Sequence, residues 1–164
     1  MTYHSGERLD GASARRLREL PEGEAMRLLA GVPFGRIVFT RHALPAVRPV
    51  NHLVVDGRIV IRSNPGTIVS THVAPAQAVV AFEADELDGH ERLGWSVIVT
   101  GVARLVTDPR EATRLKAMLL PWVAGEMDQV IRIEPEIVTG FMLVPAAALA
   151  DRRADGPPGR DLRP

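Results

Sequence analysis

The chain contains no cysteine among its 164 residues. This absence excludes a disulfide framework, a thiol nucleophile and any zinc or iron–sulfur site built from cysteine ligands. Aromatic residues make up only 4% of the sequence, too few for the stacking platforms that bind single-stranded nucleic acid. The formal net charge is zero, so the basic excess typical of nucleic-acid-binding proteins is missing as well. We therefore expect no nucleic-acid partner.

Long apolar runs are also missing. No stretch approaches the roughly 20 apolar residues of a membrane-spanning helix. The segment 1–20 is charged and lacks the apolar centre of a secretion signal. We therefore expect a cytoplasmic protein without membrane contact. A hydrophobic content of 46% over 164 residues is typical of one globular domain with a sizeable core.

The distribution of polar and apolar residues predicts one domain between two loose ends. The polar, glycine-containing segment 1–14 is expected to be a flexible arm, and the Arg/Asp/Gly/Pro-rich segment 150–164 a disordered tail. The domain then spans 15–149. Helical patterns occur at 14–20, 21–31, 67–73 and 108–119.

Most of the remaining chain has the pattern of β-strands. Strands are expected at 36–41, 46–55, 58–62, 76–83 and 94–107, and a last strand or pair of strands at 129–133 and 136–144, interrupted near Pro135. Asp56-Gly57 is a strong signal for a tight hairpin between the second and third strands. Neighbouring strands that are mostly antiparallel, with few short helices, favour a closed barrel over an open α/β sheet.

The sequence carries no established catalytic signature. It contains no HExxH, no GxSxG, no phosphate loop of the GxxxxGK[ST] type and no GxGxxG that opens a helix. The five histidines are scattered, so we interpret them as solvated or incidentally buried and expect no metal site. The acidic residues between Glu83 and Asp88 are interpreted as part of a solvated loop over 84–93.

The stretch from Pro49 to Thr71, together with the neighbouring Arg48, is the most informative about a binding site. There a strand, a tight hairpin and a turn that opens a short helix bring a guanidinium, two hydroxyls and a helix N-terminus together. Unpaired N–H groups at a helix N-terminus bind anions, Arg62 could grip a phosphate, and Gly66 allows close backbone approach. The competing interpretation is a simple capped turn, with Ser63 or Thr67 as the cap.

The order of these segments resembles one family. Arg48-Pro49-Val50-Asn51, Arg62-Ser63 with Pro65-Gly66-Thr67, Val79–Glu83 and Gly94–Arg104 follow one another as in the pyridoxamine 5′-phosphate oxidase-like FMN-binding split barrels, in particular their short actinobacterial flavin- and deazaflavin-dependent branch. The resemblance covers about 33–144. It implies a mainly β fold, a six-stranded antiparallel split β-barrel with a few short flanking helices, and a homodimer whose subunits both contact each cofactor.

The resemblance also implies roles for individual residues. Pro49, Val50 and Asn51, next to Arg48, would lie along the edge of the flavin ring. The phosphate would meet Arg62 and Ser63 and the turn formed by Gly66, Thr67 and Ile68. Trp95 would lie near the cofactor cleft across the dimer. No catalytic side chain is implied, because in such enzymes the flavin carries out the hydride chemistry.

Two positions depart from the pattern of this family. Relatives commonly place a lysine where this chain has Ile68, and an arginine where it has Phe141. Loss of one charge-assisted contact weakens binding by about ten- to a hundredfold. These departures leave three alternatives. The cofactor binds more weakly, the pocket takes another ligand, or Arg48 or His72 replaces the missing charge.

These considerations predict an oxidoreductase in which FMN at a homodimer interface transfers hydride or electrons to a small organic substrate. Two alternatives stay open. One is a reductase of the same fold that uses the deazaflavin coenzyme in place of FMN. The other is a barrel without catalysis that carries a flavin or binds no cofactor.

Overall fold

The computed structural model describes residues 14–65, 69, 77–120 and 127–146. The predicted arm at 1–14, the predicted tail at 150–164 and the predicted helix at 67–73 lie outside these residues, apart from Ala14 and Val69. Their structures therefore stay predictions, and the description below concerns the domain between them.

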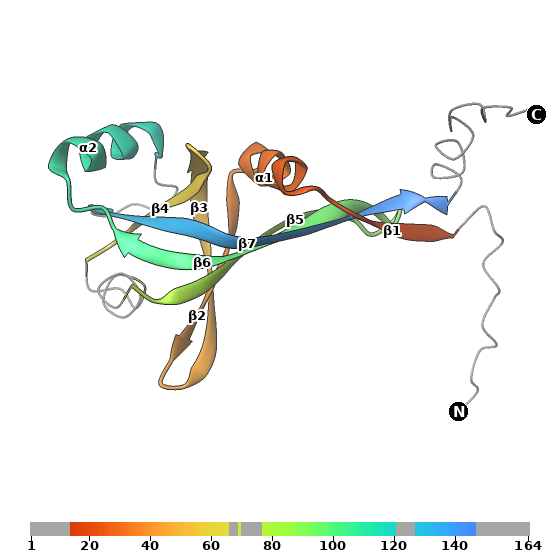
Figure 1. Cartoon of the computed structure of the whole chain (residues 1–164), viewed down its shortest axis with the longest axis horizontal. Helices are drawn as coiled ribbons and strands as arrows, with labels where there is room; N and C mark the ends of the chain where they lie inside the picture. The colour runs from red at the N-terminus through yellow and green to blue at the C-terminus, as the bar shows by residue number, and fades with distance from the viewer. Residues whose placement is uncertain (1–13, 66–68, 70–76, 121–126, 147–164) are drawn as a thin grey trace, which may run out of the picture.

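Six strands form a closed antiparallel ring (Figure 1). Around the ring the order is β7-β4-β3-β2-β5-β6, and a pairing between β6 and β7 closes it. The strands are β2 (Phe34–Arg41), β3 (Leu44–Val55), β4 (Arg58–Ser63), β5 (Val79–Asp88), β6 (Leu93–Leu105) and β7 (Gln129–Pro145). The predicted barrel class is confirmed. So is the hairpin turn between β3 and β4, where Asp56 and Gly57 both have positive φ angles of 51° and 74°.

A seventh strand, β1 (Arg15–Glu19), replaces the helix predicted at 14–20. It pairs antiparallel with the last part of β7, from Arg15 opposite Pro145 to Glu19 opposite Phe141. β7 is longer than its partners in the ring, and its free end offers backbone groups that another strand can pair with. A helical pattern in seven residues could not compete with this long-range pairing.

Two further local predictions were wrong. The expected loop at 84–93 is mostly strand, because β5 continues to Asp88. Arg36 on β2 explains why this acidic stretch can join the sheet: its Nη1 lies 2.8 Å from a carboxylate oxygen of Glu83 and 3.0 Å from one of Asp85.

The second concerns Pro135, which does not interrupt β7. A register shift between Thr100 and Gly101 on β6 accommodates the proline instead. At Gly101 an added Cβ would lie 2.0 Å from the carbonyl oxygen of Glu134, so only glycine allows this approach of the two strands.

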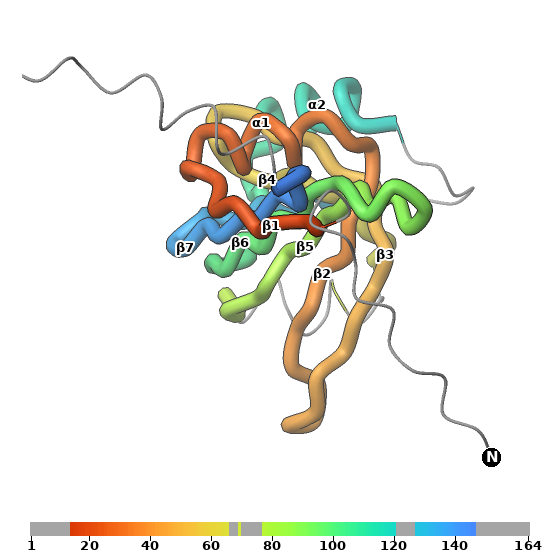
Figure 2. The backbone as a smooth tube through the Cα atoms, turned by 90° about the vertical axis from the view of Figure 1, so that its right-hand side faces the viewer, coloured from red at the N-terminus to blue at the C-terminus, as the bar shows by residue number. Residues whose placement is uncertain are grey.

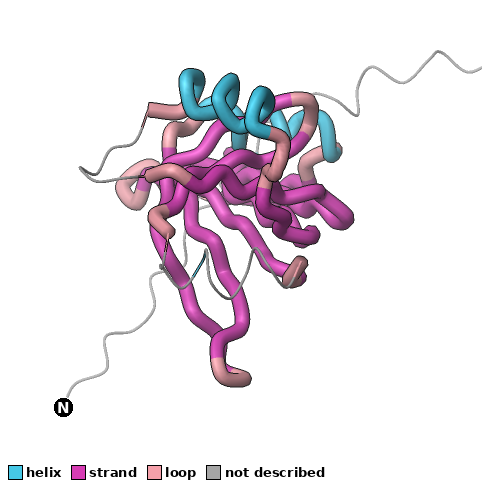
Figure 3. The backbone as a smooth tube through the Cα atoms, turned by 90° about the vertical axis from the view of Figure 1, so that its left-hand side faces the viewer, coloured by secondary structure: helices cyan, strands magenta, loops and turns pink. Residues whose placement is uncertain are grey.

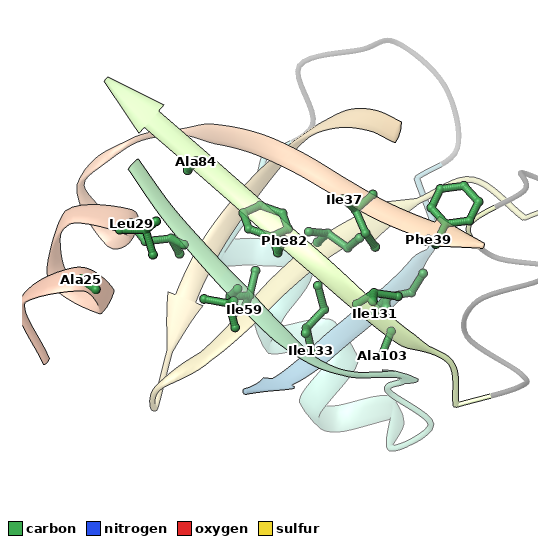
Figure 4. Close-up of a cluster of buried hydrophobic side chains, with 14 of the residues drawn as sticks. Ala25, Leu29, Ile37, Phe39, Ile59, Phe82, Ala84, Ala103, Ile131 and Ile133 are labelled. Atoms are coloured by element: carbon green, nitrogen blue, oxygen red, sulfur yellow. The ribbon is translucent and has the colours of Figure 1, made fainter. Parts of the chain in front are cut away.

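The main core fills the inside of the ring (Figure 4). Alternate residues of each strand point inward, and Ile37, Phe82, Ile59 and Ile131 are fully buried. Ala25 and Leu29 of helix α1 (Glu22–Gly31) join the same cluster, so α1 covers part of the barrel. Pro21 lies at the N-cap of this helix.

Helix α2 (Pro109–Met118) lies on the same side of the barrel as α1 (Figure 3). Its Leu115 packs with Val60 and Val130 in a second, smaller cluster on the outside of the ring. Asp108 caps its N-terminus by accepting hydrogen bonds from the backbone N–H groups of Arg110 and Glu111. The tip of the β2–β3 hairpin projects away from both helices (Figure 2). None of the helices in the described ranges is long and apolar enough to cross a membrane.

Candidate functional site

The strands that carry most predicted site residues are neighbours. β3 pairs with β4 from Val55 opposite Arg58 to His52 opposite Ile61. Asn51 and Arg62 are the next positions along the two strands. The ladder therefore places Asn51 beside Arg62, whereas Arg48 and Pro49 lie beyond the end of this ladder, where β3 pairs with β2. Gly66, Thr67 and Ile68 lie outside the described residues.

Arg62 uses its guanidinium to bind backbone carbonyls. Its Nε donates to the carbonyl oxygen of Met127 at 2.8 Å, and its Nη1 donates to the carbonyl oxygen of Leu119 at 3.1 Å. A longer contact of 3.4 Å joins Nη1 to the carbonyl oxygen of Lys116. Lys116 and Leu119 belong to the C-terminal end of α2, and Met127 lies two residues before β7. The guanidinium thus holds the end of a helix, a role that cationic side chains commonly fill.

The other predicted residues of β3 and β4 differ in exposure. Arg48 and Pro49 are exposed, and the only described partner of the Arg48 Nη1 is the carbonyl oxygen of its own neighbour Val47, at 2.8 Å. Asn51 donates from Nδ2 to the carbonyl oxygen of Leu120 at 2.9 Å, so it also binds the segment that follows α2. Ser63 is buried.

His52 is a second buried polar residue of this region. Its Nε2 lies 2.9 Å from the carbonyl oxygen of Leu29 in the last turn of α1, and its ring meets Phe82 edge-on with 4.8 Å between centroids. Burial lowers the pKa of His52, and the hydrogen bond to Leu29 opposes this only in part. The ring is therefore neutral near pH 7, and Nε2 carries the proton that it donates to Leu29.

A groove of about 380 Å³ opens over β3 beside these residues. Asn51, His52 and Leu53 form its floor. The C-terminal ends of both helices form its walls, with Ala30 to Pro33 on one side and Met118 to Leu120 on the other. Its volume lies at the lower end of the range of small-molecule sites, about 300–1,000 Å³. Apolar walls with a few polar groups suit a planar ring system better than a highly charged ligand.

Trp95 is not part of this groove. It lies on β6, which is three strands away from β3 in either direction around the ring. Its side chain is 7% exposed and belongs to the main core. A smaller pocket of about 230 Å³ lies beside it, lined also by Glu86, Asp88 and Leu93. Within one chain, the structure does not bring Trp95 together with Asn51 and Arg62.

Sequence reasoning missed the walls of the groove. The bonds from His52 to Leu29 and from Arg62 to Leu119 join residues 23 and 57 positions apart. No local pattern signals such contacts, although a histidine at an inward position of β3 is a hint of a buried polar group. Among the described residues, no group of three or more His, Asp or Glu side chains could hold a metal ion.

Known proteins share this sequence and fold. A family profile described as pyridoxamine 5′-phosphate oxidase matches residues 21–142. The uncharacterized protein Rv0080 of Mycobacterium tuberculosis is 57% identical over 135 residues, which cover 80% of this chain and 89% of the relative.

Two solved structures show the same architecture. A Corynebacterium glutamicum protein provisionally named pyridoxamine 5′-phosphate oxidase is 33% identical with a TM-score of 0.67, covering 77% of this chain and 98% of that one. A FAD-binding protein of Mycobacterium smegmatis is 30% identical with a TM-score of 0.61, and the covered shares are again 77% and 98%. With the closed ring of six antiparallel strands and a profile match over most of the domain, the chain belongs to the pyridoxamine 5′-phosphate oxidase family.

Proposed function

We propose that this protein is a cytoplasmic flavin-binding oxidoreductase, in which FMN at a homodimer interface passes hydride or electrons to a small organic substrate. The observation that carries the proposal is the family match over 21–142, together with a groove over β3 that is lined by Asn51, one of the proposed ring-binding residues. The M. smegmatis relative at 30% identity is a FAD-binding protein, which supports a flavin as the ligand.

The groove suits the ring system of a flavin. Its walls are largely apolar, and its floor includes Asn51, whose side-chain oxygen can accept a hydrogen bond while Nδ2 binds Leu120. A flavin supplies a centre that accepts and donates hydride when it is bound. The tasks left to this chain are to bind the ring, to orient it and to keep water from it.

The phosphate end of the proposed site would lie near Ser63 and the turn that follows β4. Segment 63–78 contains no lysine or arginine, and its only basic residue is His72. Backbone N–H groups and hydroxyls would therefore provide most of the phosphate contacts. We expect FMN to bind more weakly than in a site with two or three cations, by about ten- to a hundredfold for each missing contact.

A second copy of the chain would need a surface on which to pack. The outer face of β5, β6 and β7 exposes the side chains of Val79, Ile98, Ile137 and Phe141. Contiguous apolar side chains on a protein surface are typical of contact with another protein. We propose this face as the contact with the second copy. Because β6 lies opposite β3 in the ring, the face does not border the groove over β3 of the same chain.

Absorbance of the purified protein tests this proposal. We expect a yellow protein, or a colourless one that takes up FMN in titration with close to one FMN per chain. Light scattering of the same sample should give twice the mass of the chain. A protein that binds the deazaflavin coenzyme but not FMN would replace the cofactor and keep the reaction class. A protein that binds neither would leave only the family and the fold.

A further inference from the structure

A single side chain joins three segments beside the groove. Arg62 extends from β4 and binds the carbonyl oxygens of Leu119 and Met127, which lie on the two sides of positions 121–126. The end of α2 and the start of β7 are therefore held against β4 by one guanidinium. Asn51 adds a bond from β3 to the carbonyl oxygen of Leu120.

The electrostatics at this place do not favour a phosphate. Nε and Nη1 of Arg62 both donate to carbonyl oxygens of the described residues, which leaves Nη2 as the nitrogen for another acceptor. Those oxygens belong largely to the C-terminal end of α2, which carries the negative end of the helix dipole. A phosphate that approached this guanidinium would meet the same negative end.

We propose that Arg62 is a positioning residue, which fixes the end of α2 and the start of β7 and so builds one wall of the groove, and that it is not a ligand of the cofactor phosphate. The second half of this inference rests on the proposed flavin site, whereas the first half does not. Leu119 and Leu120, which Arg62 and Asn51 hold, line the groove directly.

The forked shape of arginine is essential for this role. Its Nε and Nη1 reach two separate segments at once, at 2.8 Å and 3.1 Å. A lysine has one ammonium group on a flexible stem and cannot reproduce this geometry, but it can still bind a phosphate as a point charge. Arg62→Lys therefore separates the two roles, since it removes the fork and keeps the charge.

The experiment compares Arg62→Ala and Arg62→Lys with the wild type and with Arg41→Ala, which changes an exposed arginine at the end of β2. Amide hydrogen exchange is measured first, without any flavin. We expect both Arg62 variants to exchange faster in the last turn of α2 and at the start of β7, and Arg41→Ala to match the wild type. Failure of Arg62→Ala to fold while Arg41→Ala folds would support the same conclusion. Unchanged exchange in both Arg62 variants would overturn the positioning role.

Titration with FMN and with riboflavin, which lacks the phosphate, then tests the second half. We expect each Arg62 variant to weaken binding of both flavins by the same factor. If Arg62 were a phosphate ligand, Arg62→Ala would weaken FMN by a further ten- to a hundredfold, roughly, and Arg62→Lys would restore much of it. That result would overturn the inference. Absence of FMN and riboflavin binding in the wild type would instead contradict the proposed function and leave the exchange result intact.

Discussion

The two helices of this protein end at the same groove but are attached in different ways. A buried imidazole, that of His52, binds the last turn of α1. The side chains of Ala25 and Leu29 on the same helix enter the main core. The end of α2 is held by Arg62, a half-buried guanidinium, and Leu115 packs in the smaller cluster outside the ring.

The two walls of the groove are therefore held in place by different interactions. α1 depends on deep apolar packing, with a titratable group that must stay neutral. α2 has less apolar packing and depends more on hydrogen bonds from the side chains of Arg62 and Asn51. We therefore expect the attachment of α1 to respond to core mutations and acid, and that of α2 to respond to loss of polar contacts.

The largest effect is expected from truncation of the apolar contacts. Leu29→Ala should lower the free energy of unfolding by about 2–5 kcal/mol, because Leu29 is fully buried in the main core. Leu115→Ala removes a similar side chain from the smaller cluster, so it should open α2 locally more than it lowers global stability. Urea unfolding and hydrogen exchange of the two variants measure both quantities. Equal local opening of both helices in the two variants would show that the clusters are one cooperative unit.

A smaller effect is expected from pH. Burial lowers the pKa of His52 in the folded protein, so below its ordinary value of 6.5 the unfolded chain binds more protons than the folded one. The stabilisation by neutral His52 is complete above about pH 6.5 and is lost as the pH falls toward the lowered pKa. His52→Gln keeps a donor for the Leu29 carbonyl but does not titrate.

The measurement is urea unfolding of wild type and variant at several pH values from 7.5 to 5. The difference between their unfolding free energies should shrink or reverse as the pH falls, while His90→Gln, which changes an exposed histidine, should follow the wild type. A constant difference over this range would mean that His52 does not titrate with folding.

The smallest of these effects on stability is expected at the N-terminal ends of the two helices. Asp108 caps α2 with its carboxylate, whereas Pro21 at the N-cap of α1 makes no such bond. Asp108→Ala should therefore cost about 1 kcal/mol, and Asp108→Ser, which can still accept from the same N–H groups, much less. Thermal unfolding of both variants checks this. An equal loss in both would point to the charge of Asp108 at the helix dipole as the cause.

Local patterns in the sequence predicted much of the fold correctly. Asp56-Gly57, the Asp108-Pro109 helix start and the alternation along β3 each depend on residues within a few positions of one another. Errors occurred where distant pairing decided the outcome. β1 is a strand because the end of β7 lies beside it, and the acidic residues of β5 are tolerated because Arg36 lies across from them.

The site itself stays a prediction, although its strands could be predicted. The sequence placed Asn51 and Arg62 on the two arms of one hairpin, and both lie next to the last pair of the ladder between β3 and β4. Their hydrogen-bond partners could not be predicted, because Leu119, Leu120 and Met127 are separated from them by more than 50 residues. The proposed roles of Trp95 and of the turn at 66–68 stay predictions.

The pairing of β1 with β7 also has a practical consequence. The backbone N–H of Ala146 donates to the carbonyl oxygen of Ala14 at 3.2 Å, so the described chain enters and leaves the fold at one place, at the end away from α2 (Figure 1). A linker of a few residues could join these positions, and new ends could be opened at the exposed Asp56-Gly57 turn. Such a circular permutant would keep every strand of the ring, and the new termini would offer attachment points for probes on another part of the barrel.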